Sequence, residues 1–246
     1  MRSVFNILLI FLMLTLWSCS KDNLFDCFKG AGKTIKEQRD IYYFNSIHLR
    51  NNLNLILIQD SINKVIVEAG KNIQDGIKTE VENNMLVISN ENKCNWVRSY
   101  DNPMNVYVHF KKLDSLYYSS SGDVNCSNIW KNDSIKLIVF EGGGSINLSI
   151  HTFKSQFHVR YGTVDLNVTG ESQVNFISAS GYGPVNCSSL RNVFTYIHNA
   201  STNNCFVYTT LYLDANISSV GNIYYRGNPQ TVNEYISGSG RVIKQD

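Results

Sequence analysis

The sequence has few prolines, few charged residues and no helical periodicity. Only 3 of its 246 residues are proline and 17% are charged, with a formal net charge of +2. A general nucleic-acid binder needs a dense positive field to neutralise phosphates, so nucleic acid is not an expected partner. No stretch repeats apolar residues at positions i, i+3, i+4 and i+7, which predicts essentially no helix. The 14 tyrosines, 12 phenylalanines and 16 glycines instead favour strands joined by tight corners.

The amino-terminal residues have the organisation of an export signal. Arg2 precedes an apolar run from Val4 to Leu16, which is too short to cross a bilayer as a helix. The run ends in Leu16-Trp17-Ser18-Cys19, which resembles a bacterial lipobox, a motif whose cysteine is acylated and becomes the first residue of the mature protein. We therefore expect export, and membrane attachment through a lipid on Cys19.

This reading divides the chain and predicts its location. Residues 1–18 are expected to be a lipoprotein signal peptide, and the polar residues 19–40 a tether. The sequence SKDN at residues 20–23 resembles the tag that sends Bacteroidetes lipoproteins to the outer cell surface. We predict an outer-membrane lipoprotein that faces the cell exterior.

The other five cysteines lack the spacing of a metal site. No CxxC pair occurs, so we expect no zinc, and we assign no cofactor. Because their number is odd, they cannot all form disulfides. Cys126, Cys187 and Cys205 fall at apolar strand positions and are interpreted as small core side chains. The sequence does not decide whether Cys27 and Cys94 pair.

The carboxyl-terminal half repeats a strand, a glycine corner and a second strand. The clearest copy is VNEYISGSGRVI at residues 232–243, and weaker copies extend back to about residue 116. The residues that follow each corner align as Asp123, Ser145, Thr163, Pro184, Asn203, Asn222 and Arg241. The steps between them are 22, 18, 21, 19, 19 and 19 residues. A near-constant step of this size predicts coils that stack in parallel as a β-solenoid.

Apolar and polar residues alternate after each corner. Apolar residues flank a single polar one in the triplets Val124–Cys126, Ile146–Leu148, Val164–Leu166 and Val185–Cys187. This alignment puts Asp165 in the polar row. Because side chains alternate across a strand, the apolar residues should point into the core and the polar ones into solvent. Stacking would then build an aliphatic core beneath an outer polar ladder.

Three segments resemble a known family. FNSIHL at residues 44–49, YRGNP at residues 225–229 and ISGSGRV at residues 236–242 are similar to the pattern of the putative auto-transporter adhesin, head GIN domain family. The resemblance covers residues 41–246 and implies a right-handed parallel β-helix, with repeats clearest from residue 116 to residue 246. It also implies a role in adhesion or binding at the cell envelope, and brings no catalytic motif.

Two other functions remain open. Parallel β-helices include polysaccharide-degrading enzymes, which need carboxylates close together on neighbouring coils. The acids of this chain rarely recur at matching positions of adjacent coils, so we assign no catalytic residue and expect no enzyme. His158 and His198 align two coils apart, about 9.6 Å, too far to share a metal. A periplasmic envelope or signalling accessory protein is the other alternative.

Binding fits the pattern better than catalysis. Tyr161 and Tyr182 each precede a corner glycine in successive coils, so their rings could stack at one exposed ridge. With the outward Asn147, Asp165 and Asn186 they would offer aromatic faces beside amides and a carboxylate, the groups that hold a sugar. These side chains could equally form ladders that only stabilise the coils. The expected partners are a glycan or an extracellular or envelope protein.

Overall fold

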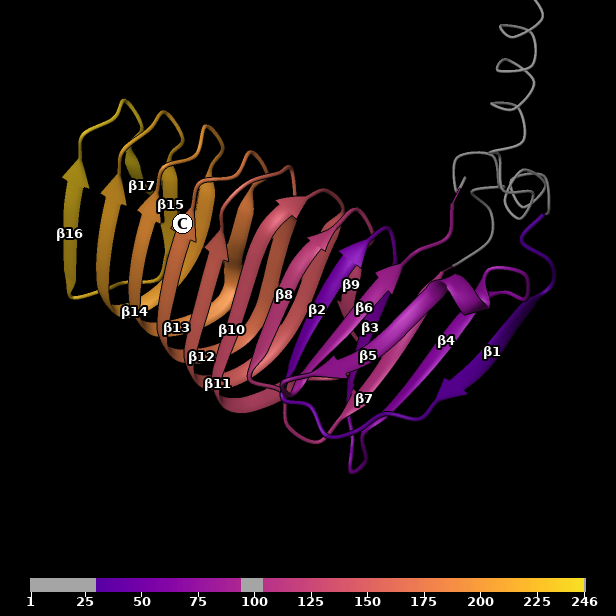
Figure 1. Ribbon diagram of the computed structural model, residues 1–246. Helices are drawn as coiled ribbons and strands as arrows, with labels where there is room; N and C mark the ends of the chain where they lie inside the picture. Colours follow the sequence, from indigo (N-terminus) through magenta and orange to yellow (C-terminus); the bar gives the residue numbers. More distant parts are fainter. Residues whose placement is uncertain (1–29, 94–103, 246) are drawn as a thin grey trace, which may run out of the picture.

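Alternating apolar and polar residues shape most strands of the computed structural model, which describes residues 30–93 and 104–245 (Figure 1). Over these residues the prediction of essentially no helix is confirmed, because their helical structure is one 3-10 turn at Gln74–Gly76. None of their helical structure has the length and apolar character needed to cross a membrane. The expected signal peptide, Cys19, Cys27 and Cys94 lie outside the described residues.

The strands are short at both ends of the chain and long between residues 130 and 217, where they have 13–15 residues each. The first seven are β1 (Thr34–Arg39), β2 (Ser46–Asn51), β3 (Asn54–Gln59), β4 (Lys64–Gly70), β5 (Ile77–Glu82), β6 (Met85–Asn90) and β7 (Asn105–Phe110). The solenoid strands are β8 (Ser115–Ser120), β9 (Val124–Cys126), β10 (Trp130–Gly142), β11 (Ser145–Val159), β12 (Asp165–Ala179), β13 (Val185–Asn199), β14 (Cys205–Ile217), β15 (Ile223–Arg226), β16 (Thr231–Ile236) and β17 (Val242–Lys244).

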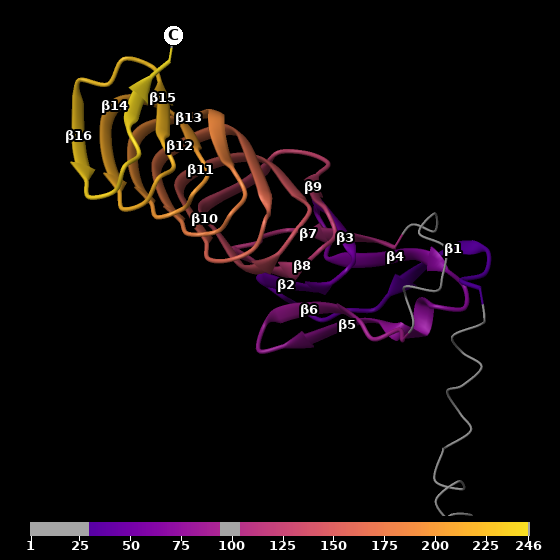
Figure 2. The same ribbon diagram turned by 90° about the horizontal axis from the view of Figure 1, so that it is seen from above.

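The strands form two layers, seen from the side in Figure 1 and from above in Figure 2. The front face runs β16–β14–β13–β12–β11–β10–β8–β2–β6–β5, and the back face runs β17–β15–β14–β13–β12–β11–β9–β3–β7–β4–β1. The long strands β11 to β14 belong to both faces because each one bends. In β11 the bend lies near His151–Phe153, between its pairing with β9 and its front-face half.

The coils stack in parallel at the predicted period of about 20 residues, which confirms the solenoid. One row of stacked residues runs Val124, Ile146, Leu166, Val185, Cys205, Ile223 and Val242. Two of the residues that follow the corners were aligned wrongly. Asp165, not Thr163, pairs with Ser145. Because Cys205 pairs with Val185, the residue that corresponds to Pro184 is Asn204 and not Asn203. Hydrogen bonds between strands set the register, whereas the corners differ in length.

The inward orientation of the predicted apolar residues is confirmed, although Leu166 takes the predicted place of Val164 beside Ile146. Ile146, Leu166, Val185 and Cys205 are 0–1% exposed, as a continuous core requires. Cys187 is also fully buried, and burial raises the pKa of its thiol and raises that of Cys205 to about 12. These thiols stay protonated at neutral pH and act as small apolar side chains, as predicted.

Two corner glycines are required by the stacking of the coils. Gly144 has φ +81°, a left-handed conformation that side chains with a Cβ rarely adopt. A Cβ on Gly183 would lie 1.9 Å from the carbonyl oxygen of Val164 in the preceding coil. Both reasons for corner glycines, positive φ and close approach, were expected from the repeat.

A carboxylate lies at the end of the core, in the last coil. The inward row Phe157, Ile177, Ile197 and Ala215 is continued by Glu234 of β16. Phe157 and Ala215 are fully buried, whereas Glu234 is exposed because no further strand follows β16 in the described sheet. An inward-facing charge on an edge strand discourages another strand from adding to it.

The amino-terminal strands extend both faces by antiparallel pairing. β1 pairs with β4 from Thr34 to Arg39, so residues 34–39 of the expected tether belong to the folded sheet and not to a linker. β5 and β6 form a hairpin through Asn83 and Asn84, whose φ values are +50° and +62°. This turn was predicted because asparagine tolerates positive φ.

Candidate functional site

The predicted polar row exists on the back face, with one member replaced. Asn147 donates from Nδ2 to Oδ1 of Asn125 at 3.0 Å, and Asn167 donates to Oδ1 of Asn147 at 3.1 Å. Asn167 also pairs with Asn186 in the next coil, so it occupies the place that was predicted for Asp165. Asp165 lies two residues earlier, beside Ser145 at the strand start. The row is therefore a ladder of amides without a carboxylate.

Tyr161 and Tyr182 lie at the corners after β11 and β12, where they are 68% and 64% exposed. The backbone N–H of Tyr182 donates to the carbonyl oxygen of Gly162 at 2.7 Å, the bond that a residue matched with Thr163 makes in a parallel ladder, so Tyr182 is not matched with Tyr161. Stacked rings occur at other positions on both faces. Phe176 and Tyr196 on the front face lie 5.0 Å apart with planes inclined by 12°, and Phe206 and Tyr224 on the back face lie 5.1 Å apart with planes inclined by 11°. A ligand-binding role for the two corner tyrosines stays a prediction.

A groove crosses the coils on the outside of the bend, and we call it the bend groove. Its volume is about 680 Å³. One wall comes from Lys131, His151, Glu171 and Arg191, the other from Asp133, Phe153, Gln173, Val193 and Thr210, with Asn132, Thr152 and Ser172 between them. Each wall takes one residue from each successive coil, so the groove runs parallel to the solenoid axis.

The first wall is a ladder of ionisable side chains. Lys131 pairs with His151, His151 with Glu171, and Glu171 with Arg191 in the register of β10 to β13. Nδ1 of His151 lies 3.6 Å from Oε2 of Glu171, and both side chains are more than half exposed. Glu171 lies between His151 and Arg191 in this row and partly offsets the charge of the basic side chains, which leaves donors and acceptors free for a polar ligand.

The opposite wall offers an apolar surface. The ring of Phe153 is 65% exposed and lines this wall. Gln173 is the next residue along this wall and presents an amide. An exposed ring beside amide and charged groups is suited to a ligand with apolar and hydroxyl-bearing faces.

Small polar side chains form the floor and the layer beneath it. Thr152 and Ser172 are 6% and 3% exposed. Oγ of Ser155 donates to Oδ1 of Asn175 at 2.9 Å and lies 2.9 Å from Oγ of Ser172. Hydrogen bonds rather than aliphatic packing therefore hold the coils together at the bend.

Sequence reasoning missed the bend groove, although a signal was present. Lys131, His151, Glu171 and Arg191 recur at intervals of 20 residues. A search for side chains at the repeat period would have found this row. Our alignment started from the corner glycines, which do not keep a constant distance from the bend.

Known proteins resemble this chain in sequence pattern and in fold. The family model described as putative auto-transporter adhesin, head GIN domain, matches residues 43–229. No curated protein matches the chain.

Several crystal structures share the fold. A putative adhesin from Bacteroides fragilis superposes with a TM-score of 0.78 at 19% identity, covering 88% of this chain and 100% of that one. A putative lipid binding protein from Parabacteroides distasonis has a TM-score of 0.68 at 21% identity, covering 87% and 98%. A putative adhesin from the same species has a TM-score of 0.67 at 18% identity, covering 88% and 99%.

Proposed function

The chain belongs to the putative auto-transporter adhesin, head GIN domain family, and from this premise we propose that it is a non-catalytic, adhesin-like binding module of the cell envelope. We further propose that a lipid on Cys19 anchors it to the outer membrane and that the solenoid faces the cell exterior. The interior of the coils is filled by rows of buried side chains, so a ligand has to bind at the surface.

The bend groove is the proposed binding site, and its ligand is an extended oligosaccharide. This assignment is supported by the regularity of the groove, because each coil contributes one side chain to each wall. Coils repeat about every 4.8 Å, a distance similar to the advance of one sugar in a linear chain. Phe153 would pack on the apolar face of a sugar ring while Gln173, His151 and Arg191 bind its hydroxyl groups.

The acids of the bend groove support binding rather than glycoside hydrolysis. Asp133 and Glu171 line opposite walls and lie two coils apart, which separates them by about 9.6 Å along the axis alone. Adjacent coils, whose backbones are only about 4.8 Å apart, contribute no pair of carboxylates to the groove. Glu171 is also more than half exposed and pairs with His151.

Titration of the full chain with hexasaccharides of cellulose, chitin, mannan and xylan tests the binding site. We expect at least one to bind, and the Phe153→Ala, Gln173→Ala double variant to weaken its affinity at least tenfold. Tyr161→Ala, Tyr182→Ala tests the corner site predicted from the sequence, and if the bend groove is the binding site this variant should bind as the wild type does. Binding lost only in the tyrosine variant would move the site to the corners, and release of new reducing ends would make the protein an enzyme.

Exposure to protease on intact cells tests the proposed location. Proteinase K added to whole cells should degrade the protein while a periplasmic control protein survives, and Cys19→Ala should release the protein from the membrane fraction. Protection of the wild type would remove the exterior-facing proposal and favour a periplasmic envelope accessory protein.

A further inference from the structure

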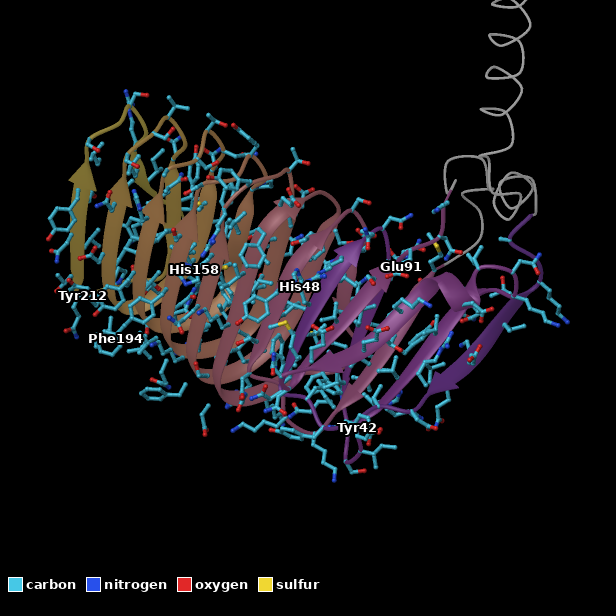
Figure 3. All side chains as sticks on the ribbon, viewed as in Figure 1. Tyr42, His48, Glu91, His158, Phe194 and Tyr212 are labelled. Atoms are coloured by element: carbon cyan, nitrogen blue, oxygen red, sulfur yellow. The ribbon has the colours of Figure 1, made fainter. Side chains whose placement is uncertain are left out.

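A second polar surface lies on the front face and shares no residue with the bend groove. We define the cationic patch as Arg50, His48, Tyr117, Phe140, Lys136, His158 and Arg160. Figure 3 labels His48 and His158, which both lie on this face of the solenoid. The patch joins β2, β8, β10 and β11 and the residue that follows β11.

Aromatic rings hold the patch together. The Tyr117 and Phe140 rings stack at 6.1 Å with planes inclined by 11°, and the His48 ring lies 6.0 Å from that of Phe140. The guanidinium carbon of Arg160 lies 5.1 Å from the centre of the Phe140 ring. Because this cation–π contact restricts the Arg160 side chain, less conformational entropy is lost when a ligand binds it.

Both histidines of the patch are held neutral. Partial burial, with the nearby charge of Arg50, lowers the pKa of His48, and burial with Lys136 and Arg160 lowers that of His158. Arg50 donates to Nδ1 of His48 at 3.2–3.3 Å, which leaves the proton of this ring on Nε2, 3.3 Å from Oγ of Ser119. The histidines therefore contribute hydrogen bonds, while the positive charge comes from the two arginines and the lysine.

Arg50, Lys136 and Arg160 form no ion pair with any of the described residues. Carboxylates within 4.0 Å of a basic group occur elsewhere in residues 30–93 and 104–245. Glu141 borders the patch, since it pairs with Ser119 beside Arg50, but it makes no ion pair with Arg50, Lys136 or Arg160 among these contacts. Oriented cations without carboxylate partners are suited to an anionic ligand.

We propose that the cationic patch is an anion-binding site that takes the carboxylate or sulfate groups of an acidic polysaccharide. The choice of a polysaccharide as the carrier of these anions rests on the proposed function and on continuity with the bend groove. Lys154 follows Phe153 of the groove wall onto the front face, where its Nζ lies 5.2 Å from the centre of the Phe176 ring. On the same face Lys154 pairs with Ser134 of β10, two residues before Lys136, so the groove wall and the patch adjoin along β10 and β11.

Binding of the full chain to a charged and an uncharged polymer tests this site. Dextran sulfate and dextran share a sugar backbone and differ in charge. At physiological ionic strength we expect dextran sulfate to bind and the triple variant Arg50→Gln, Lys136→Gln, Arg160→Gln to weaken that binding at least tenfold. The matched control, Lys71→Gln, Lys111→Gln, Arg241→Gln, removes three exposed cations elsewhere and should bind as the wild type does, as should Phe153→Ala.

Four outcomes would overturn the proposal. The wild type fails to bind dextran sulfate, both triple variants lose affinity equally, dextran binds as well as its sulfate, or anionic phospholipid vesicles bind the patch in preference to the polymer. Loss of hexasaccharide binding in Phe153→Ala with dextran sulfate binding intact separates the bend groove from the patch. Thermal melting of every variant checks that the fold is retained.

Discussion

Replacing Ile146 with aspartate should leave the chain unfolded. Ile146 is fully buried and stacks between Val124 and Leu166 in the inward row. Truncating a buried isoleucine alone costs about 2–5 kcal/mol, and burying an unpaired carboxylate adds a larger desolvation penalty. Domains of this kind have a free energy of unfolding of about 5–15 kcal/mol. Circular dichroism and thermal melting of the purified variant measure the effect.

Asn147→Asp is the control for this substitution. It places the same charge one residue along, on the exposed side of the same strand, where it can alter the amide ladder but not the core. We expect it to fold with a melting temperature close to that of the wild type. A soluble Ile146→Asp variant with an unchanged melting temperature would show that the inward register is wrong.

Replacing Glu234 with leucine should make the solenoid associate through its last coil. The substitution continues the inward row of Phe157, Ile177, Ile197 and Ala215 with an apolar side chain at an open strand edge. Tyr235 and Ile236 of β16 are already 54% and 45% exposed. Unprotected edges of this kind pair with other strands. Sedimentation velocity over a range of concentrations should show oligomers or aggregates that the wild type lacks.

Thr231→Leu adds the same side chain to the same strand on its outward side. Thr231 pairs with Tyr212 and is exposed, so the added leucine does not extend the core. This variant should sediment as the wild type does. If Glu234→Leu also remains as small as the wild type at every concentration, Glu234 is not what keeps the edge free.

Most of the architecture was accessible from particular residues of the sequence. The alternation in Ile146–Leu148 and Val185–Cys187 predicted the inward rows, because a strand presents successive side chains to opposite faces. Asn83-Asn84 predicted a turn, since few residues other than glycine tolerate positive φ. These are local properties, which depend on neighbours in the chain.

The functional surfaces were less accessible. Asp165 was assigned to the outward row because the alignment of β12 was counted from Gly162. The corner after β11 is two residues longer than that count assumed, so Asn167 and not Asp165 lies in the row. The cationic patch brings His48 of β2 beside Phe140 of β10, residues that no repeat relates to each other. Neither the shifted polar row nor the cationic patch could be detected from composition or from periodicity alone.

The sequence by itself determined a β-solenoid with a period of about 20 residues, its aliphatic core and its glycine corners, because each depends on local alternation and backbone conformation. The tertiary structure alone decided which side chains of different coils lie side by side. Hydrogen bonds align the strands, whereas corners of unequal length absorb the extra residues, so a one- or two-residue difference in a corner exchanges the members of a row. The bend groove, the cationic patch and the carboxylate that ends the core all depend on that register.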